Sequence, residues 1–167
     1  MIELVVVMIV LLIFTMVVWS TYQYSNSITD RLTAETDGLK VSLRFAQMQA
    51  FNDDMVKWGI SFSTNTTYRL YANYVDASMT IPVKGETNDS GDPITAACPQ
   101  NCHQLSGNVQ ITSTVPIINF DNWGRPLDGS GNLLLQDPRI TLSLVSSGTD
   151  MHIFGVDQHT GFIYDVP

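Results

Sequence analysis

The stretch Met1–Trp19 constrains this chain more than any other part of its sequence. It reads MIELVVVMIVLLIFTMVVW, and Glu3 is its one charged residue. Each large aliphatic side chain in such a run gains about 1.5–3 kcal/mol when it leaves water. The run also approaches the roughly 17–25 residues with which a helix spans a bilayer. We therefore expect a helix that leaves water for a membrane.

Two ordinary interpretations of this segment fit it poorly. A secretory signal peptide has basic residues before its apolar core and small residues at its cleavage site. Here an acid opens the run, and Trp19-Ser20-Thr21-Tyr22 closes it, so we expect the segment to stay on the mature protein. A plain membrane anchor has no use for Glu3, since a carboxylate at mid-bilayer costs about 2.5–3.5 kcal/mol. Glu3 is therefore a candidate functional residue.

The start of the chain resembles a known family of filament subunits. Met1-Ile2-Glu3-Leu4, followed by an aliphatic run, is similar to the N-terminus of mature type IV pilins and type II secretion pseudopilins. Glu3 matches that family's glutamate. Two residues that precede this glutamate in the family are absent here. Either the sequence begins slightly inside the mature chain, or the subunit has a shortened start.

The resemblance implies a route of assembly. In that family a prepilin peptidase removes a basic leader, the new terminus is methylated, and an assembly platform moves the subunit from the cytoplasmic membrane into an extracellular helical filament. It implies that Glu3 pairs with the N-terminal amine of a neighbouring subunit and sets the axial register, because an unpartnered buried carboxylate is strongly unfavourable. The filament-core residues that it implies are Leu4, Val7, Met8, Leu11, Leu12, Phe14 and Val18.

Length and charge limit the fold and the partners that the rest of the chain can have. The 167 residues leave enough sequence after Trp19 for one domain with a sizeable core. Sixteen acidic and eight basic residues give a net charge of −8. The basic residues form no run, whereas a general nucleic-acid surface needs clustered Lys and Arg. The composition thus weighs against DNA binding and suits an extracytoplasmic surface.

A helical pattern continues past the apolar segment to about Asp54 and becomes amphipathic. Most charged residues of this part, Glu35 among them, are expected on the faces away from its apolar stripe. That stripe, spaced by three, four or seven residues, consists of Ile28, Leu32, Leu39, Leu43, Ala46 and Ala50. The sequence predicts one long helix over residues 1–54, with an apolar first half and an amphipathic second half that packs against a head.

After Gly59 the pattern alternates, as in strands, and turn signals such as Asp128-Gly129-Ser130 and His159-Thr160-Gly161 separate the alternating runs. The predicted strands cover residues 60–63, 68–74, 79–84, 109–113, 117–121, 139–145, 151–156 and 162–166. The predicted class is therefore α+β, with a long N-terminal helix packed on an antiparallel β-sheet head over residues 55–167.

The last third of the chain narrows the resemblance to one group within the pilin and pseudopilin family. The sequences Asp121-Asn122-Trp123-Gly124-Arg125-Pro126 and Thr160-Gly161-Phe162-Ile163 are similar to the closing part of GspH/FimT-type minor pseudopilins and minor pilins. The first of them is also similar to a turn of major pseudopilins. Major and minor subunits therefore both stay open.

Cys98 and Cys102 lie close together before His103, in a chain that its N-terminus directs out of the cytoplasm. We predict a disulfide between them, because such compartments permit one. Covalent haem attachment uses C-x-x-C-H, and here one extra residue separates the cysteines. A metal site would need a further ligand from His152, His159 or a distant acid. We expect neither a metal nor a cofactor.

No arrangement of residues typical of catalysis stands out. The histidines are scattered without a nucleophile signature, and the glycine-rich turns lack the lysine of a phosphate-binding loop. Glu86, Asp89 and Asp92 are interpreted as solvated charge rather than as a calcium loop. The leading hypothesis is a structural subunit of a type IV pilus-like filament. The alternative is a minor pilin or pseudopilin of a secretion or DNA-uptake machine, which primes or tips a filament and binds a ligand.

Overall fold

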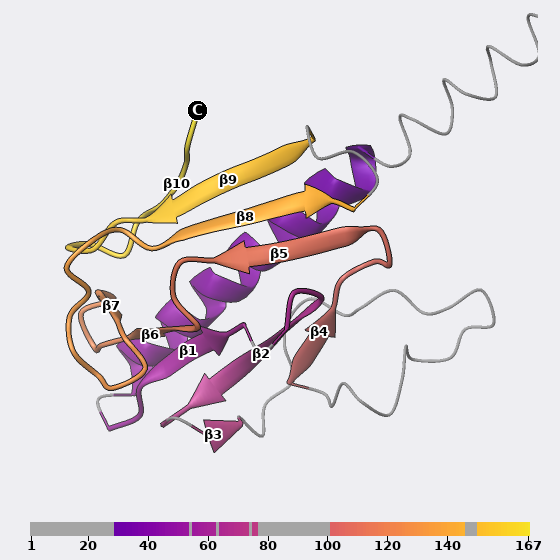
Figure 1. Cartoon of the computed structure of the whole chain (residues 1–167). Coiled ribbons are helices and arrows are strands. Elements are labelled where there is room, and N and C mark those ends of the chain that lie inside the picture. The colour runs from indigo at the N-terminus through magenta and orange to yellow at the C-terminus, as the bar shows by residue number, and fades with distance from the viewer. Residues whose placement is uncertain (1–28, 54, 63, 74, 77–100, 146–149) are drawn as a thin grey trace, which may run out of the picture. The chain divides into compact units, whose positions relative to one another are not determined.

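The computed structural model describes residues 29–53, 55–62, 64–73, 75–76, 101–145 and 150–167 (Figure 1). The chain divides into two compact units, Met1–Arg31 and Leu32–Pro167. The described residues hold one helix, over residues 29–52, and ten strands. Among them no helix has the length and apolarity needed to cross a membrane. The apolar segment Met1–Trp19 lies outside them.

The helix buries a continuous stripe of apolar side chains in the second unit. Its residues 32–52 cross behind strands of both sheets (Figure 1). The stripe residues, each at most 1% exposed, are Leu32, Leu39, Leu43, Ala46 and Ala50. These are the positions predicted from the spacing, so the amphipathic second half is confirmed. Ile28 lies outside the described residues.

The first sheet follows the order β3-β2-β1-β6-β7, with β4 also paired to β2. All of its pairs are antiparallel. Both β3 and β4 use the edge of β2 that β1 leaves open, opposite residues 71–72 and 67–69 of β2. The bounds are β1 Trp58–Ser61, β2 Thr67–Ala72, β3 Val75–Asp76, β4 Cys102–Gln104, β6 Ile117–Phe120 and β7 Pro126–Leu127.

The second sheet is an antiparallel ladder of four strands in the order β10-β9-β8-β5. Alternate residues of β8 point into the core, where Ile140 and Leu142 are fully buried beside Phe154 of β9. Lys40 of the helix pairs with Asp165 of β10. The bounds are β5 Val109–Ser113, β8 Arg139–Leu144, β9 Met151–Val156 and β10 Ile163–Asp165.

The predicted α+β class, with an antiparallel head, is confirmed. Strands β5 and β9 have the predicted bounds, and the other predicted strands that reach the described residues differ by one or two residues at one or both ends. The predicted strand 79–84 lies outside those residues. β3, β4 and β7 were not predicted, because strands of two or three residues offer too few positions for alternation to be seen.

Candidate functional site

The residues singled out for assembly lie outside the described part of the chain, and their roles stay predictions. They are Glu3 and the filament-core residues Leu4, Val7, Met8, Leu11, Leu12, Phe14 and Val18. Cys98 also lies outside, so its disulfide with Cys102 stays a prediction. Cys102 itself opens β4 and is 8% exposed. His152 is half-buried on β9, and His159 is exposed on a turn. In the described ranges no three His, Cys, Asp or Glu side chains gather in a way that could hold a metal ion.

Glu35 departs from the predicted pattern, because its carboxylate is buried rather than solvated. His103 Nε2, on β4, lies 2.7 Å from Glu35 Oε2. The backbone N–H of Ser106 donates to Glu35 Oε1 at 2.9 Å. A buried carboxylate is tolerated when both of its oxygens have donors. Glu35 therefore fastens the helix to β4 and to the turn that follows it.

Tyr68 covers this buried pair from β2. Its ring is fully buried and lies against the imidazole of His103, with centroids 4.9 Å apart and planes tilted by 36°. Its hydroxyl lies 3.4 Å from Ser42 Oγ on the helix. Burial raises the pKa of Tyr68 well above its ordinary value. The hydrogen bond with Ser42 lowers it to a smaller extent, and the negative charge of Glu35 raises it further.

Tyr68 should therefore make the head less stable in alkali. Above the ordinary tyrosine pKa of 10.0, the unfolded chain loses the phenol proton while the folded chain keeps it. The free energy of unfolding should then fall by about 1.4 kcal/mol per pH unit through this residue alone. Urea unfolding of the wild type and Tyr68→Phe at pH 9 to 11 tests this. The difference between the two proteins should shrink as the pH rises, and a constant difference would contradict the prediction.

A tight turn after β6 is held by one carboxylate. Asp121 Oδ1 accepts the backbone N–H groups of Trp123 at 3.0 Å and Arg125 at 2.8 Å. Asp121 Oδ2 accepts Arg125 Nε at 2.8 Å and Nη2 at 2.7 Å. Gly124, at φ 77°, supplies the left-handed residue that the turn needs. The backbone at Trp123 is thus fixed from several directions.

A second turn, before β10, repeats this design. Asp157 Oδ1 accepts the N–H of His159 at 3.0 Å and of Thr160 at 2.8 Å, and the Thr160 hydroxyl at 2.7 Å. The donation from the Thr160 side chain, followed by its N–H, lowers the pKa of Asp157 below its usual range. Gly161 takes the left-handed conformation here, at φ 70°. The predicted turn at His159-Thr160-Gly161 is therefore confirmed.

The helix joins the two turns through Gln47. Gln47 Nε2 donates to the carbonyl oxygen of Gly124 at 2.9 Å and to that of Gly161 at 3.3 Å. A Cβ added to Gly161 would overlap the Gly124 carbonyl, and one added to Gly124 would meet the Phe51 ring. The two turns are therefore in direct backbone contact. Gly161 is required by the lack of space beside the Gly124 carbonyl, and Gly124 is favoured by its left-handed φ of 77°.

Large aromatic side chains surround this junction and face solvent. Trp123 is 70% exposed, Phe162 66% and Phe51 53%. Beside them lies a hollow of about 420 Å³, here named the Trp123 hollow, which is lined by Trp123, Arg125, His159 and Thr160. Its volume falls within the range of about 300–1,000 Å³ that is typical of small-molecule sites. Surface Trp and Arg are also the residues most enriched where proteins bind.

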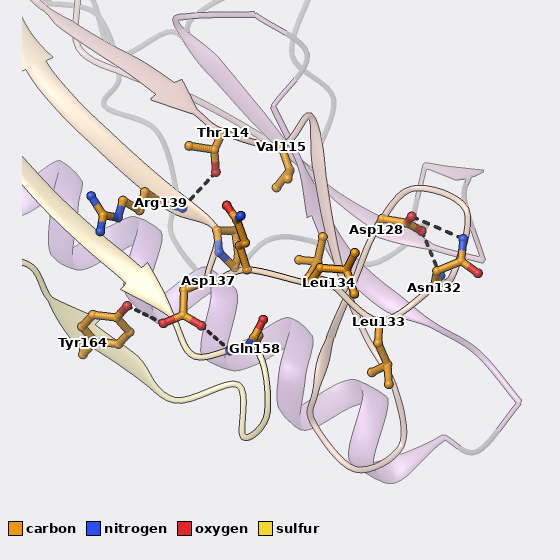
Figure 2. A pocket seen from close by; sticks show the side chains of 13 residues that line it. Thr114, Val115, Asp128, Asn132, Leu133, Leu134, Asp137, Arg139, Gln158 and Tyr164 are labelled. Atoms are coloured by element: carbon orange, nitrogen blue, oxygen red, sulfur yellow. Dashed lines mark hydrogen bonds between the residues drawn. The ribbon is translucent and has the colours of Figure 1, made fainter.

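A larger groove of about 1130 Å³ lies between β7 and the start of β8 (Figure 2). Its two carboxylates already accept hydrogen bonds from nearby residues of the chain. Asp137 accepts the Tyr164 hydroxyl at 2.7 Å and the N–H of Gln158 at 2.9 Å, and the first of these bonds raises the pKa of Tyr164. Asp128 accepts the N–H groups of Ser130 and Asn132 at 2.8 Å, and its pKa is lowered, by the Asn132 bond above all. These polar groups thus shape the groove.

Sequence reasoning missed the Glu35–His103 pair, although a signal was present. Glu35 lies three residues after Leu32 and four before Leu39, which places it on the buried face of the helix. A charged residue within an apolar stripe calls for a buried partner. That partner came from β4, a strand too short to be predicted. At the Trp123 hollow, the sequence indicated only a turn motif.

Comparisons with known proteins support the fold. No family model matches the chain, and no curated protein does. The crystal structure of the type IV minor pilin FimU of Pseudomonas aeruginosa is similar, with a TM-score of 0.50 and 13% identity over 84% of this chain and 92% of that one. A second crystal form of the same protein gives a TM-score of 0.48 and 12% identity, over 80% and 92%. The chain therefore has a type IV pilin-like fold.

Proposed function

We propose that this chain is a structural subunit of an extracellular type IV pilus-like filament. The subunit is held in the cytoplasmic membrane before assembly and polymerises through its N-terminal helix. The observation that carries the proposal is the type IV pilin-like fold, joined in the same chain to the apolar segment Met1–Trp19. Prepilin peptidase, an assembly platform and further copies of the subunit are its proposed partners. The proposal assigns no catalytic reaction and no cofactor.

Within the filament, the apolar side chains of Met1–Trp19 supply cohesion, and Glu3 supplies register. A carboxylate that enters an apolar bundle needs a cationic partner. The N-terminal amine of a neighbouring subunit supplies that partner in one axial position, and a slipped subunit leaves both charges unpaired. The axial register of the subunits is therefore fixed, because every slipped position costs free energy.

Glu3→Ala should leave the head folded and membrane insertion intact while preventing assembly. An unpaired buried charge costs about 3–5 kcal/mol, and every 1.4 kcal/mol is about tenfold in an equilibrium. Sheared filaments should therefore contain at least about 100-fold less of this variant. Asp30→Ala is the matched control, because Asp30 is an exposed acid on the helix. Normal filaments from the Glu3→Ala cells would contradict the register role.

The second candidate function is that of a minor subunit, which primes or tips a filament or belongs to a secretion pseudopilus. The similar solved structures are of a minor pilin, which favours this alternative. Mass spectrometry of sheared filaments separates the two candidates. A major subunit should dominate the fibre, whereas a minor subunit should be present in traces, with fibre number falling when its gene is deleted.

A further inference from the structure

The Trp123 hollow combines high exposure with a fixed backbone. A tryptophan that is 70% exposed on a mobile loop would have little consequence. Here the Asp121 carboxylate holds the N–H of Trp123 itself, and Gln47 fastens the next residue, Gly124, to the helix. A rigid aromatic surface binds with a smaller loss of conformational entropy. The backbone that carries the exposed indole is therefore held in place before a ligand binds.

The charges around the hollow are balanced. Arg125 directs Nε and Nη2 to Asp121, so part of its positive charge is already neutralised. Asp157 accepts the N–H groups of Thr160 and His159 and adds a second negative charge behind these two lining residues. The carboxylates of Asp121 and Asp157 do not line the hollow, but each is hydrogen-bonded to a residue that does, so their negative charges lie close to any phosphate or sulfate placed there. A strongly anionic ligand is therefore disfavoured.

The remaining chemistry fits a flat ligand that is apolar on one face and hydroxylated at its edge. The exposed indole attracts polarised C–H bonds through its negative ring face. Arg125, 41% exposed, supplies a hydrogen-bonding group at the rim through Nη1, because its Nε and Nη2 bond Asp121. The exposed ring of His159 supplies a second through Nδ1, because its Nε2 already lies 3.1 Å from Gln158 Nε2. The Thr160 hydroxyl is already used, since it donates to Asp157 and accepts from the N–H of Phe162.

We propose that the Trp123 hollow binds a neutral saccharide, with one pyranose ring stacked on Trp123 and its hydroxyl groups bonded to Arg125 and His159. The larger groove of Figure 2 is a weaker site, because Asp128 and Asp137 hold its own loops. Saccharide binding is separate from filament assembly. A Glu3→Ala chain should bind the sugar as the wild type does.

The test uses the full chain in micelles of lauryldimethylamine oxide, a detergent without a sugar headgroup. The probes are maltose, cellobiose, lactose and N,N′-diacetylchitobiose, with sialyllactose as the anionic comparison. Saturation-transfer difference NMR and tryptophan fluorescence measure binding. Leu135→Ala is the matched control, because Leu135 is 91% exposed and lines the other groove. Near-UV circular dichroism checks that each variant is folded.

At least one neutral disaccharide should bind with millimolar affinity. Trp123→Ala should weaken that binding by at least about tenfold, which is the usual effect of removing an aromatic side chain on which a ligand stacks. Trp123→Phe should weaken the binding less. Leu135→Ala should leave it unchanged. Three results would overturn the proposal: no binding of any neutral probe at tens of millimolar, binding that Trp123→Ala leaves intact, or tighter binding of sialyllactose than of lactose that depends on Arg125.

Discussion

Replacing Glu35 with alanine should lower the free energy of unfolding of the head by about 3 kcal/mol. The substitution leaves two buried donors, His103 Nε2–H and the N–H of Ser106, without their acceptor. Each unsatisfied buried donor costs about 1–3 kcal/mol. The gain in helix propensity from alanine is well under 1 kcal/mol. Urea unfolding of the full chain in micelles, followed by near-UV circular dichroism, measures the loss.

Two variants separate the buried pair from a general effect on the helix. Glu35→Gln keeps the shape and one good acceptor oxygen, so its loss should be about half as large. Asp37→Ala changes an exposed acid two residues further along, and should alter stability by less than about 0.5 kcal/mol. If Glu35→Ala and Asp37→Ala behaved alike, the fastening role of Glu35 would be excluded.

Gly161→Ala should destabilise the head by about 3 kcal/mol. The left-handed conformation at φ 70° costs a residue with a Cβ about 1–2 kcal/mol. The added Cβ also overlaps the carbonyl oxygen of Gly124, and such overpacking costs about 1–3 kcal/mol more. The turns must separate, so Gln47 can no longer bond both carbonyls. Thermal unfolding should show a lower midpoint and a changed Trp123 fluorescence.

Gly107→Ala is the matched control for this substitution. Gly107 is exposed, and a Cβ built there meets nothing within 4 Å. Its replacement should leave stability within about 0.5 kcal/mol of the wild type. A Gly161→Ala protein as stable as the Gly107→Ala protein would mean that the two turns are not in firm contact.

The helix and the longer strands were predictable because their burial is periodic. Leu32, Leu39 and Leu43 follow the helical spacing and are buried, and Ile140 and Leu142 follow the strand spacing and are buried. Hydrophobic periodicity carries this information locally, within one element. The bounds of β5, in which Val109 and Ile111 are buried in alternation, could therefore be predicted to the residue.

The pairing of distant segments could not be predicted in the same way. The partner of Glu35 lies 68 residues away, and Gln47 bonds residues 77 and 114 positions away. Nothing in the local sequence of Gln47 distinguishes it from a surface glutamine. The turn motifs around Asp121 and Asp157 were visible, but their contact with each other depends on how the sheets pack on the helix.

The shared edge of β2 has a consequence for how this head can vary. The chain leaves the sheet through β3 and returns to it through β4, and both strands pair with the same edge of β2. The positions at which the intervening sequence begins and ends are thus set by strand pairing and do not depend on the length of that sequence. Each doubling of such a connection costs only about 0.6 kcal/mol in loop-closure entropy. We therefore expect a change in the length of the sequence between β3 and β4 to leave the pairing of both strands with β2 in place.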